Sequence, residues 1–188
     1  MKNRVLSFDV DHWYESYRYR NIPHWKNVNH SDANVVEKII EILLETNNQA
    51  TFFVTGKFAV ENKKLINKAH LNGIEIASHS FEHNLLTDMN NKEIYNDLKK
   101  SRDVLEDIIG SKIYGFRAPK WSVNYKNQNY IYETLNKLGF KYDSSIFPFN
   151  FNHGPFKKEN LQKFEIGDKK LYILPITTLN LLCLRIPQ

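Results

Sequence analysis

In the stretch Ile74-Glu75-Ile76-Ala77-Ser78-His79-Ser80-Phe81-Glu82-His83, a short apolar run leads into two histidines four residues apart. We predict that residues 74–77 form a buried β-strand. Residues four apart on a helix have Cβ atoms about 5–6 Å from each other, so we expect His79 and His83 to share one helical face. Two imidazole nitrogens could then meet at one cation, and a catalytic zinc site adds a third protein ligand and an open position. Chance spacing is the alternative in a chain with seven histidines, so the rest of the sequence must supply the third ligand.

Outward from this stretch, strands and helices alternate along the chain. Apolar runs predict further strands, and apolar residues at helical spacing predict helices between them. The predicted strands are residues 5–8, 50–54, 74–77, 113–116 and 140–142. One helix is predicted to begin after Ser31, with apolar positions from Val35 to Leu44. Three more are predicted at about 63–72, 91–109 and 128–138, and a hairpin over 164–174.

This alternation predicts the fold class. Strands joined through helices require right-handed crossovers and form a parallel sheet, either open or closed into a barrel. With 188 residues, of which 41% are hydrophobic, the chain is expected to form one domain over residues 1–188. The apolar run at 181–186 stops abruptly, and we expect the domain to be truncated at its C-terminus.

Composition narrows the function classes. The net charge is +5, but lysines are scattered among glutamates, which disfavours a nucleic-acid groove. Cys183 is the only cysteine, so an internal disulfide and a cysteine-rich metal site are excluded. Neither a signal-peptide run nor a membrane-spanning run is present in the sequence, so we expect a cytoplasmic protein.

Polar residues follow four of the predicted strands. Asp9 and Asp11 follow the first strand, the two histidines the third, Arg117 the fourth and Asp143 the fifth. Because the carboxyl ends of parallel strands collect functional loops, we expect these side chains to converge. A carboxylate could complete a His-His-Asp zinc site, and the second carboxylate could act as a base. Aspartates at strand ends also cap turns, which is the structural alternative.

These residues resemble the motifs of the polysaccharide deacetylases with a NodB homology domain, carbohydrate esterase family 4. The resemblance covers nearly the whole chain and is closest to the branch found near exopolysaccharide loci. It rests on Ser7-Phe8-Asp9-Val10-Asp11, Ala50-Thr51-Phe52-Phe53-Val54, the histidine stretch from Glu75 to His83, and Arg117-Ala118-Pro119. It implies a distorted parallel (β/α) barrel of about seven strands and a divalent metal, most often Zn²⁺.

The resemblance also implies roles for single residues. Asp11, His79 and His83 would be the metal ligands, Asp9 the catalytic base, and Arg117 the residue that orients that base. The usual motif has adjacent aspartates, whereas Val10 separates them here, so the two aspartate roles could be reversed.

Three more residues are predicted to bind substrate. They are Trp121, Tyr142 and Asp143, for which an ordinary core position is an equal alternative. The general acid of the family is a histidine in a late Leu-x-x-His context, which does not occur before Gln188. His153 stands in a different context and is interpreted as a solvated loop residue.

The sequence therefore predicts a metal-dependent hydrolase that removes acetyl groups from a polysaccharide or sugar, N-acetyl before O-acetyl. Its partner would be an acetylated glycan, with neither nucleic acid nor a membrane segment involved. A non-catalytic glycan-binding or scaffold protein that retains the fold is the first alternative. A haloacid-dehalogenase-like phosphatase, favoured only by Phe8-Asp9-Val10-Asp11, is the second.

Overall fold

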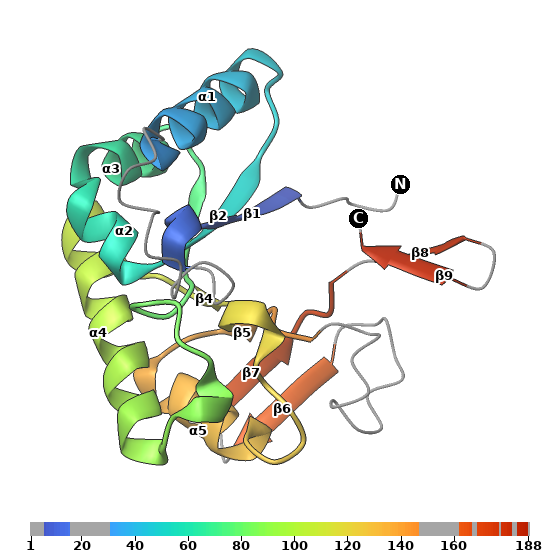
Figure 1. The fold of residues 1–188 in the computed structure, drawn as a ribbon. Helices are drawn as coiled ribbons and strands as arrows, with labels where there is room; N and C mark the ends of the chain where they lie inside the picture. The colour runs from blue at the N-terminus through green and yellow to red at the C-terminus, as the bar shows by residue number, and fades with distance from the viewer. Residues whose placement is uncertain are drawn as a thin grey trace. The chain divides into compact units, whose positions relative to one another are not determined.

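The structure is a computed structural model that describes residues 6–15, 31–146, 162–166, 169–176, 178–181 and 184–187. The chain folds into two compact units, and each has its own strands and helices (Figure 1). The first unit comprises Met1–His83 and Lys100–Ile113. The second comprises Asn84–Lys99 and Tyr114–Gln188.

Three parallel strands form the centre of the first unit. They are β1 (Leu6–Val10), β2 (Ala50–Val54) and β3 (Glu75–Ser78), in the order β1-β2-β3. Every residue of β2 is buried, as a continuous apolar run predicts for a central parallel strand. Because the strands are parallel, β1 and β3 end at the same edge, and residues just after them come close together.

Helices of the first unit pack through apolar stripes. The helix α1 (Asp32–Glu45) begins after Ser31, whose hydroxyl accepts the Asn34 N–H at 3.3 Å. The helix α3 (Lys63–Leu71) packs on β3, α1 and the short helix α2 (Gly56–Glu61). Figure 1 shows these three helices beside the strands. A single 3₁₀ turn, η1 (Trp13–Glu15), follows β1.

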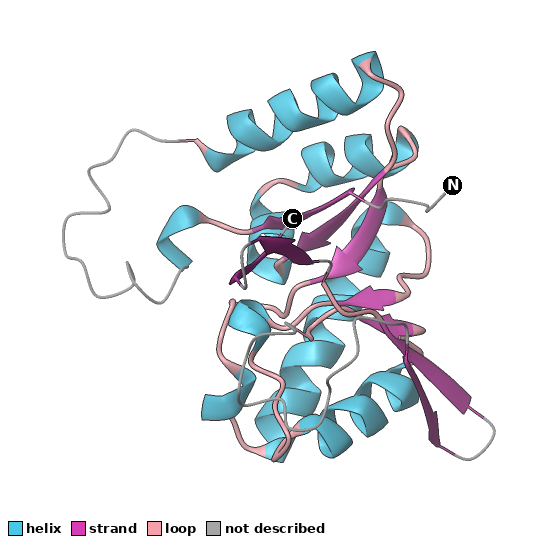
Figure 2. Cartoon of the chain, turned by 90° about the vertical axis from the view of Figure 1, so that its right-hand side faces the viewer, coloured by secondary structure: helices cyan, strands magenta, loops and turns pink. Residues whose placement is uncertain are grey.

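The second unit contains a mixed sheet. Its strands are β4 (Gly115–Phe116), β5 (Tyr142–Asp143), β6 (Gln162–Ile166) and β7 (Lys169–Ile173). Strand β5 is parallel to both β4 and β7, whereas β6 pairs with β7 as an antiparallel hairpin (Figure 2). The helix α5 (Gln128–Leu138) packs against β6 and β7 and ends at Gly139 with φ 92°.

The remaining elements connect or follow these sheets. They are α4 (Asn91–Ile109), the 3₁₀ turns η3 (Leu86–Asp88) and η4 (Pro119–Trp121), and the antiparallel strands β8 (Thr178–Leu181) and β9 (Leu184–Pro187). The first part of α4 belongs to the second unit and its part from Lys100 onward to the first. Among the described residues, no helix is long and apolar enough to cross a membrane.

The predicted α/β class with parallel strands is confirmed. The predicted ranges of β2, α4 and α5 match the structure, and the predicted hairpin is present as β6 and β7. Asp9 lies inside β1 rather than after it, because β1 extends to Val10. The helix α2 was not predicted, since six residues are too few to show a helical period.

Candidate functional site

Two carboxylates and two imidazoles come together in the first unit. Asp9 lies near the end of β1 and Asp11 directly follows that strand, so both side chains point to the same side. His79 directly follows β3, and its N–H donates to the Val54 carbonyl at 2.9 Å, which continues the strand pairing. The predicted convergence of these residues therefore holds within this unit.

The histidine stretch is a loop and not a helix, so the helical part of the prediction was wrong. Residues 79–85 form no regular element. Ser80 and His83 have positive φ angles of 65° and 57°, and the Ser80 hydroxyl accepts the His83 N–H at 3.1 Å. This tight turn brings the two imidazole rings to a centroid distance of 5.0 Å. The two rings thus lie close together as predicted, although the backbone between them is a turn and not a helix. That they share a cation stays a prediction.

Neighbouring elements hold this loop in shape. The first N–H groups of α2, from Gly56 and Lys57, donate to the carbonyls of Ser80 at 3.0 Å and Phe81 at 2.9 Å. On the other side, the buried hydroxyl of Ser101 on α4 donates to the Ser80 carbonyl at 2.9 Å. The free N–H groups of a helix start are ready donors, and here they fix a turn that contains two left-handed residues.

Each imidazole faces one carboxylate. The His83 Nε2 and Asp11 Oδ2 atoms are 3.4 Å apart, and the His79 Nε2 and Asp9 Oδ2 atoms are 3.9 Å apart. Both rings are buried, whereas 36% of the Asp9 side chain and 25% of the Asp11 side chain are exposed. The carboxylates therefore form the solvent-facing side of the cluster, from which a small ligand would approach.

Several other carboxylates lie near Asp11. Burial is the main cause that raises the pKa of Asp11 to about 7, and the carboxylates of Glu15, Asp9 and Asp32 raise it further. Like charges that cannot separate favour either protonation or a bound cation. The cluster thus carries unfavourable negative charge, which protonation or a cation would reduce.

The donor set fits a zinc-like ion in part. Within the described residues, no group of three or more His, Cys, Asp or Glu side chains forms a ready metal site. Two ligands of a tetrahedral ion with bonds of 2.0–2.2 Å lie about 3.3–3.5 Å apart. The 3.4 Å between His83 Nε2 and Asp11 Oδ2 matches this separation, whereas the second pair is longer. Imidazole nitrogen and carboxylate oxygen are also the atoms that zinc binds.

Arg117 lies in the second unit, where hydrogen bonds connect it to the segment after β5. The guanidinium is buried and donates to the Ser144 carbonyl at 3.2 Å and to the Ser144 hydroxyl at 3.1 Å. The next residue, Ala118, donates its N–H to the Ser145 hydroxyl at 2.7 Å, and that hydroxyl donates to Asp143. Hydrogen bonds therefore join the Arg-Ala-Pro motif to the segment Asp143-Ser144-Ser145.

The three predicted substrate-binding residues have different surroundings. Asp143 is fully buried, and this burial raises its pKa to about 7, while Ser145 and Arg117 act in the opposite direction. Tyr142 covers Gly115 so closely that a Cβ there would lie 2.2 Å from the tyrosine ring. Trp121 is half-buried and has a positive φ of 51°, the kind of strain that often marks a functional turn. Their contact with substrate stays a prediction, as does the role of Arg117.

Sequence reasoning missed part of the structure around the cluster. His12 and Glu15, directly after the two aspartates, are both buried and hydrogen-bonded to neighbouring elements. Their burial has no periodic signal, because they lie in a turn. Ser101 was hidden in the apolar face of α4. His153 lies outside the described residues.

The sequence is similar to proteins of one known family. A family model described as polysaccharide deacetylase matches residues 23–142. The chitooligosaccharide deacetylase of Azorhizobium caulinodans is 32% identical over 111 residues, which are 57% of this chain and 50% of that protein. The peptidoglycan-N-acetylglucosamine deacetylase of Listeria monocytogenes is 30% identical over 92 residues, 49% of this chain and 20% of that protein. The chain thus spans half or less of the length of these two relatives.

A solved structure supports the same fold. It is of a Mycobacterium smegmatis protein assigned to the polysaccharide deacetylases, with a TM-score of 0.74 and 24% identity. The likeness covers 92% of this chain and 58% of that one. At this identity it shows the fold, and it confirms the predicted fold class.

Proposed function

This chain belongs to the polysaccharide deacetylase family, and from that premise we propose that it is a metal-dependent hydrolase that removes acetyl groups from a glycan. The observation that carries the proposal is the cluster of Asp9, Asp11, His79 and His83 at the ends of β1 and β3. Its paired carboxylates and imidazoles would supply both metal ligands and a base. The family match weighs against the phosphatase alternative, which also leaves both histidines without a role.

Asp11, His79 and His83 would hold the divalent ion, which we take to be Zn²⁺. The 3.4 Å between Asp11 and His83 supports Asp11 rather than Asp9 as the carboxylate ligand. When bound, such an ion supplies Lewis acidity, which polarises the acetyl carbonyl and acidifies a water molecule. Burial of both imidazoles keeps competing water away from their nitrogens.

Asp9 would be the general base. It is the more exposed of the two carboxylates and lies 3.9 Å from His79, so it can reach an attacking water and accept its proton. Arg117, held by Ser144, is proposed to assist catalysis, and Trp121, Tyr142 and Asp143 to contact the sugar, as the family motifs imply.

An amide-linked acetyl group is the proposed substrate. Both curated relatives named above are called deacetylases of amino-sugar polymers, chitooligosaccharide in one case and peptidoglycan N-acetylglucosamine in the other. Loss of an amine from the tetrahedral intermediate also needs a proton donor, which would have to come from a group outside this cluster.

Acetate release decides between the hydrolase and the non-catalytic alternative. The metal-free protein is incubated with Zn²⁺ or Co²⁺ and with N-acetylglucosamine oligomers or O-acetylated xylan, beside His79→Ala. We expect acetate from the oligomers with wild type and none with the variant. Glycan binding without acetate release on either substrate would contradict the hydrolase and favour a glycan-binding role.

A further inference from the structure

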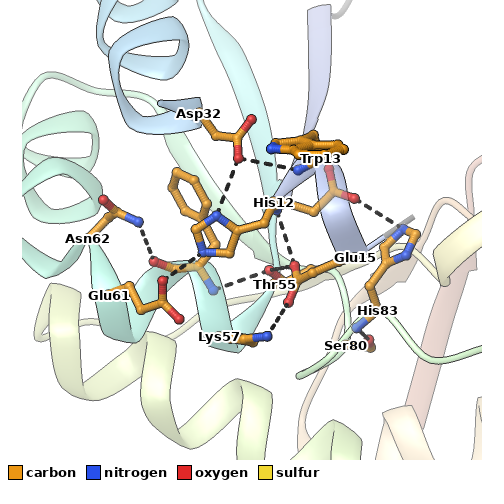
Figure 3. Close-up of polar contacts among 12 residues, drawn as sticks. His12, Trp13, Glu15, Asp32, Thr55, Lys57, Glu61, Asn62, Ser80 and His83 are labelled. Atoms are coloured by element: carbon orange, nitrogen blue, oxygen red, sulfur yellow. Dashed lines mark hydrogen bonds and ion pairs between the residues drawn. The ribbon is translucent and has the colours of Figure 1, made fainter. Parts of the chain in front are cut away.

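The His12 side chain lies between two carboxylates that belong to different helices. Its Nδ1 is 3.3 Å from Asp32 Oδ2 at the start of α1, and its Nε2 is 3.0 Å from Glu61 Oε2 at the end of α2 (Figure 3). The second contact is an ion-pair contact rather than a well-aligned hydrogen bond. Whichever ring nitrogen carries a proton therefore has a carboxylate to face.

Aromatic rings enclose the same imidazole. Tyr14 stacks on it at a centroid distance of 4.8 Å, and Phe58 of α2 lies at 4.9 Å. His12 and Asp32 are both largely buried, so their contact is shielded from water, whereas the Glu61 side chain is half-exposed. Hydrogen bonds to charged groups in such surroundings are stronger than exposed ones.

The backbone around His12 is fixed at the same place. The Trp13 N–H donates to Asp32 Oδ2 at 3.2 Å, and the His12 N–H donates to Glu15 Oε2 at 3.1 Å. Glu15 also accepts the hydroxyl of Thr55, the residue that caps α2, at 3.1 Å. The chain after Asp11 is thus bonded to the starts of α1 and α2 and to the end of α2.

His12 itself is not placed to be a metal ligand. In Figure 3 its ring points toward Asp32 and Glu61. The carboxylate of the neighbouring Asp11 lies instead 3.4 Å from His83 Nε2. The ring of His12 therefore contacts the two helices and not the histidine pair.

We propose that His12 is a positioning residue whose contacts with Asp32 and Glu61 fix the backbone that presents Asp11, and thereby set the affinity of the cluster for a divalent cation. The affinity part rests on the proposed function, while the backbone part does not need a metal. Outer partners that orient metal ligands typically contribute 10–100-fold to metal affinity. Since His12 acts through the backbone, we expect the lower end of that range.

Substitutions at position 12 separate the two contacts. His12→Ala removes both, His12→Asn keeps a donor near the place of Nδ1, and His12→Gln keeps one near the place of Nε2. Glu61→Gln is the mildest change, because 48% of that side chain is exposed. His70→Ala, on α3, is the control for loss of an imidazole.

Amide exchange in the metal-free protein and a titration with Co²⁺ or Zn²⁺ give the two readouts. We expect His12→Ala to exchange the Trp13 and His12 amides about tenfold faster and to bind the ion about tenfold more weakly. His12→Asn and His12→Gln each keep one donor, so we expect both readouts to lie between those of wild type and His12→Ala. Glu61→Gln should change both readouts less than His12→Ala does, and His70→Ala should change neither. The Co²⁺ absorption band reports whether the ligand geometry has changed.

Other outcomes assign the failure. If His12→Ala has a lower melting temperature but unchanged exchange at these amides and unchanged affinity, the positioning role is wrong. If His12→Ala does not fold, the same comparison with Glu61→Gln decides. If wild type binds neither ion, the proposed function fails, and the exchange rates alone show whether His12 fixes this backbone.

Discussion

Gly56 gives the histidine loop its room. A Cβ at this position would lie 2.3 Å from Cδ2 of Phe81, so the aromatic ring occupies the space that any side chain would need. The Lys100 Nζ of α4 lies 3.5 Å from the centre of the same ring. Phe81 therefore contacts both α2 and α4, and these contacts help to fix the turn from His79 to His83.

A side chain at position 56 should disturb both stability and the site. We expect Gly56→Ala to lower the free energy of unfolding by about 1–3 kcal/mol, because overpacking forces the ring or the backbone to move. Metal affinity should fall as well, since the ring belongs to the loop that carries both histidines. Urea unfolding and a metal titration measure the two effects.

Gly73→Ala is the matched control for this change. Gly73 has a φ of 84° and no heavy atom within 4 Å of a Cβ, so the substitution adds backbone strain of about 1–2 kcal/mol without a clash. It should lower stability and leave metal affinity unchanged. A Gly56→Ala protein with the stability and affinity of wild type would show that Phe81 does not pack against this glycine.

Among the elements, α4 is connected to the histidine loop by the hydroxyl of one buried serine. Ser101 is fully buried on this helix, lies 2.8 Å from the Ser78 hydroxyl at the end of β3 and donates to the Ser80 carbonyl. A serine inside an apolar helix face is costly unless it is hydrogen-bonded. Its two bonds connect the helix to the strand and the loop on either side of His79.

Removal of this hydroxyl should weaken the connection without breaking the helix. Ser101→Ala is expected to cost about 1–3 kcal/mol, because Ser78 is left with a buried hydroxyl that has lost this bond. Thermal or urea unfolding measures it, and Ser111→Ala, at an exposed serine just after α4, is the control. Equal stability of the two variants would mean that the Ser101 bonds contribute nothing.

Elements differ in how far the sequence predicts them. The bounds of α4 and α5 follow from long apolar periods and from the glycines that end them. The loop from His79 to His83 could not be predicted, because a four-residue spacing suits both a helix and a tight turn. The donors that select the turn come from α2 and α4, and short-range patterns do not contain this information.

Across the molecule, both units contain carboxyl groups whose pKa is raised by burial. The pKa of Asp11 in the first unit and that of Asp143 in the second are each about 7, and the pKa of Glu15 is raised as well. In the unfolded chain these groups ionise at about pH 4. Folding therefore takes up protons between these values.

Stability of the metal-free protein should accordingly depend on pH. Because the folded state binds more protons than the unfolded state between about pH 4 and pH 7, the free energy of unfolding should fall as pH rises through this range. The part due to Asp11 is complete below about pH 4 and lost by about pH 7. Urea unfolding across this range, with a chelator present, measures the slope.

Asp11→Asn isolates one of these groups. The variant lacks the carboxyl, so its stability should fall less steeply over the same pH range than that of wild type. Identical slopes would mean that Asp11 ionises normally in the folded protein. Because a bound cation favours the ionised carboxylate, added Zn²⁺ should flatten or reverse the wild-type slope only.

At this scale the sequence predicted the location of the site better than its details. The rule that parallel strands end at one edge correctly brought Asp9, Asp11, His79 and His83 together. It could not show which carboxylate faces which imidazole, because that depends on side-chain packing. Nor could it show His12, Glu15 and Thr55 as supports, since their contacts join segments far apart in the chain.

Metal content measured together with turnover in four purified variants tests the central claim most directly. The claim is that Asp11, His79 and His83 hold the ion while Asp9 takes the proton of the attacking water. Asp11→Asn, His79→Ala and His83→Ala should lose stoichiometric metal and activity, because each removes one of three protein ligands. Asp9→Asn should keep the metal while turnover falls by about 10²–10⁴-fold.

Two results would contradict this account in different ways. If Asp9→Asn loses the metal and Asp11→Asn keeps it, the two aspartate roles are reversed. If all four variants retain the metal, the ion is held elsewhere, and the deacetylase mechanism proposed for this cluster is wrong.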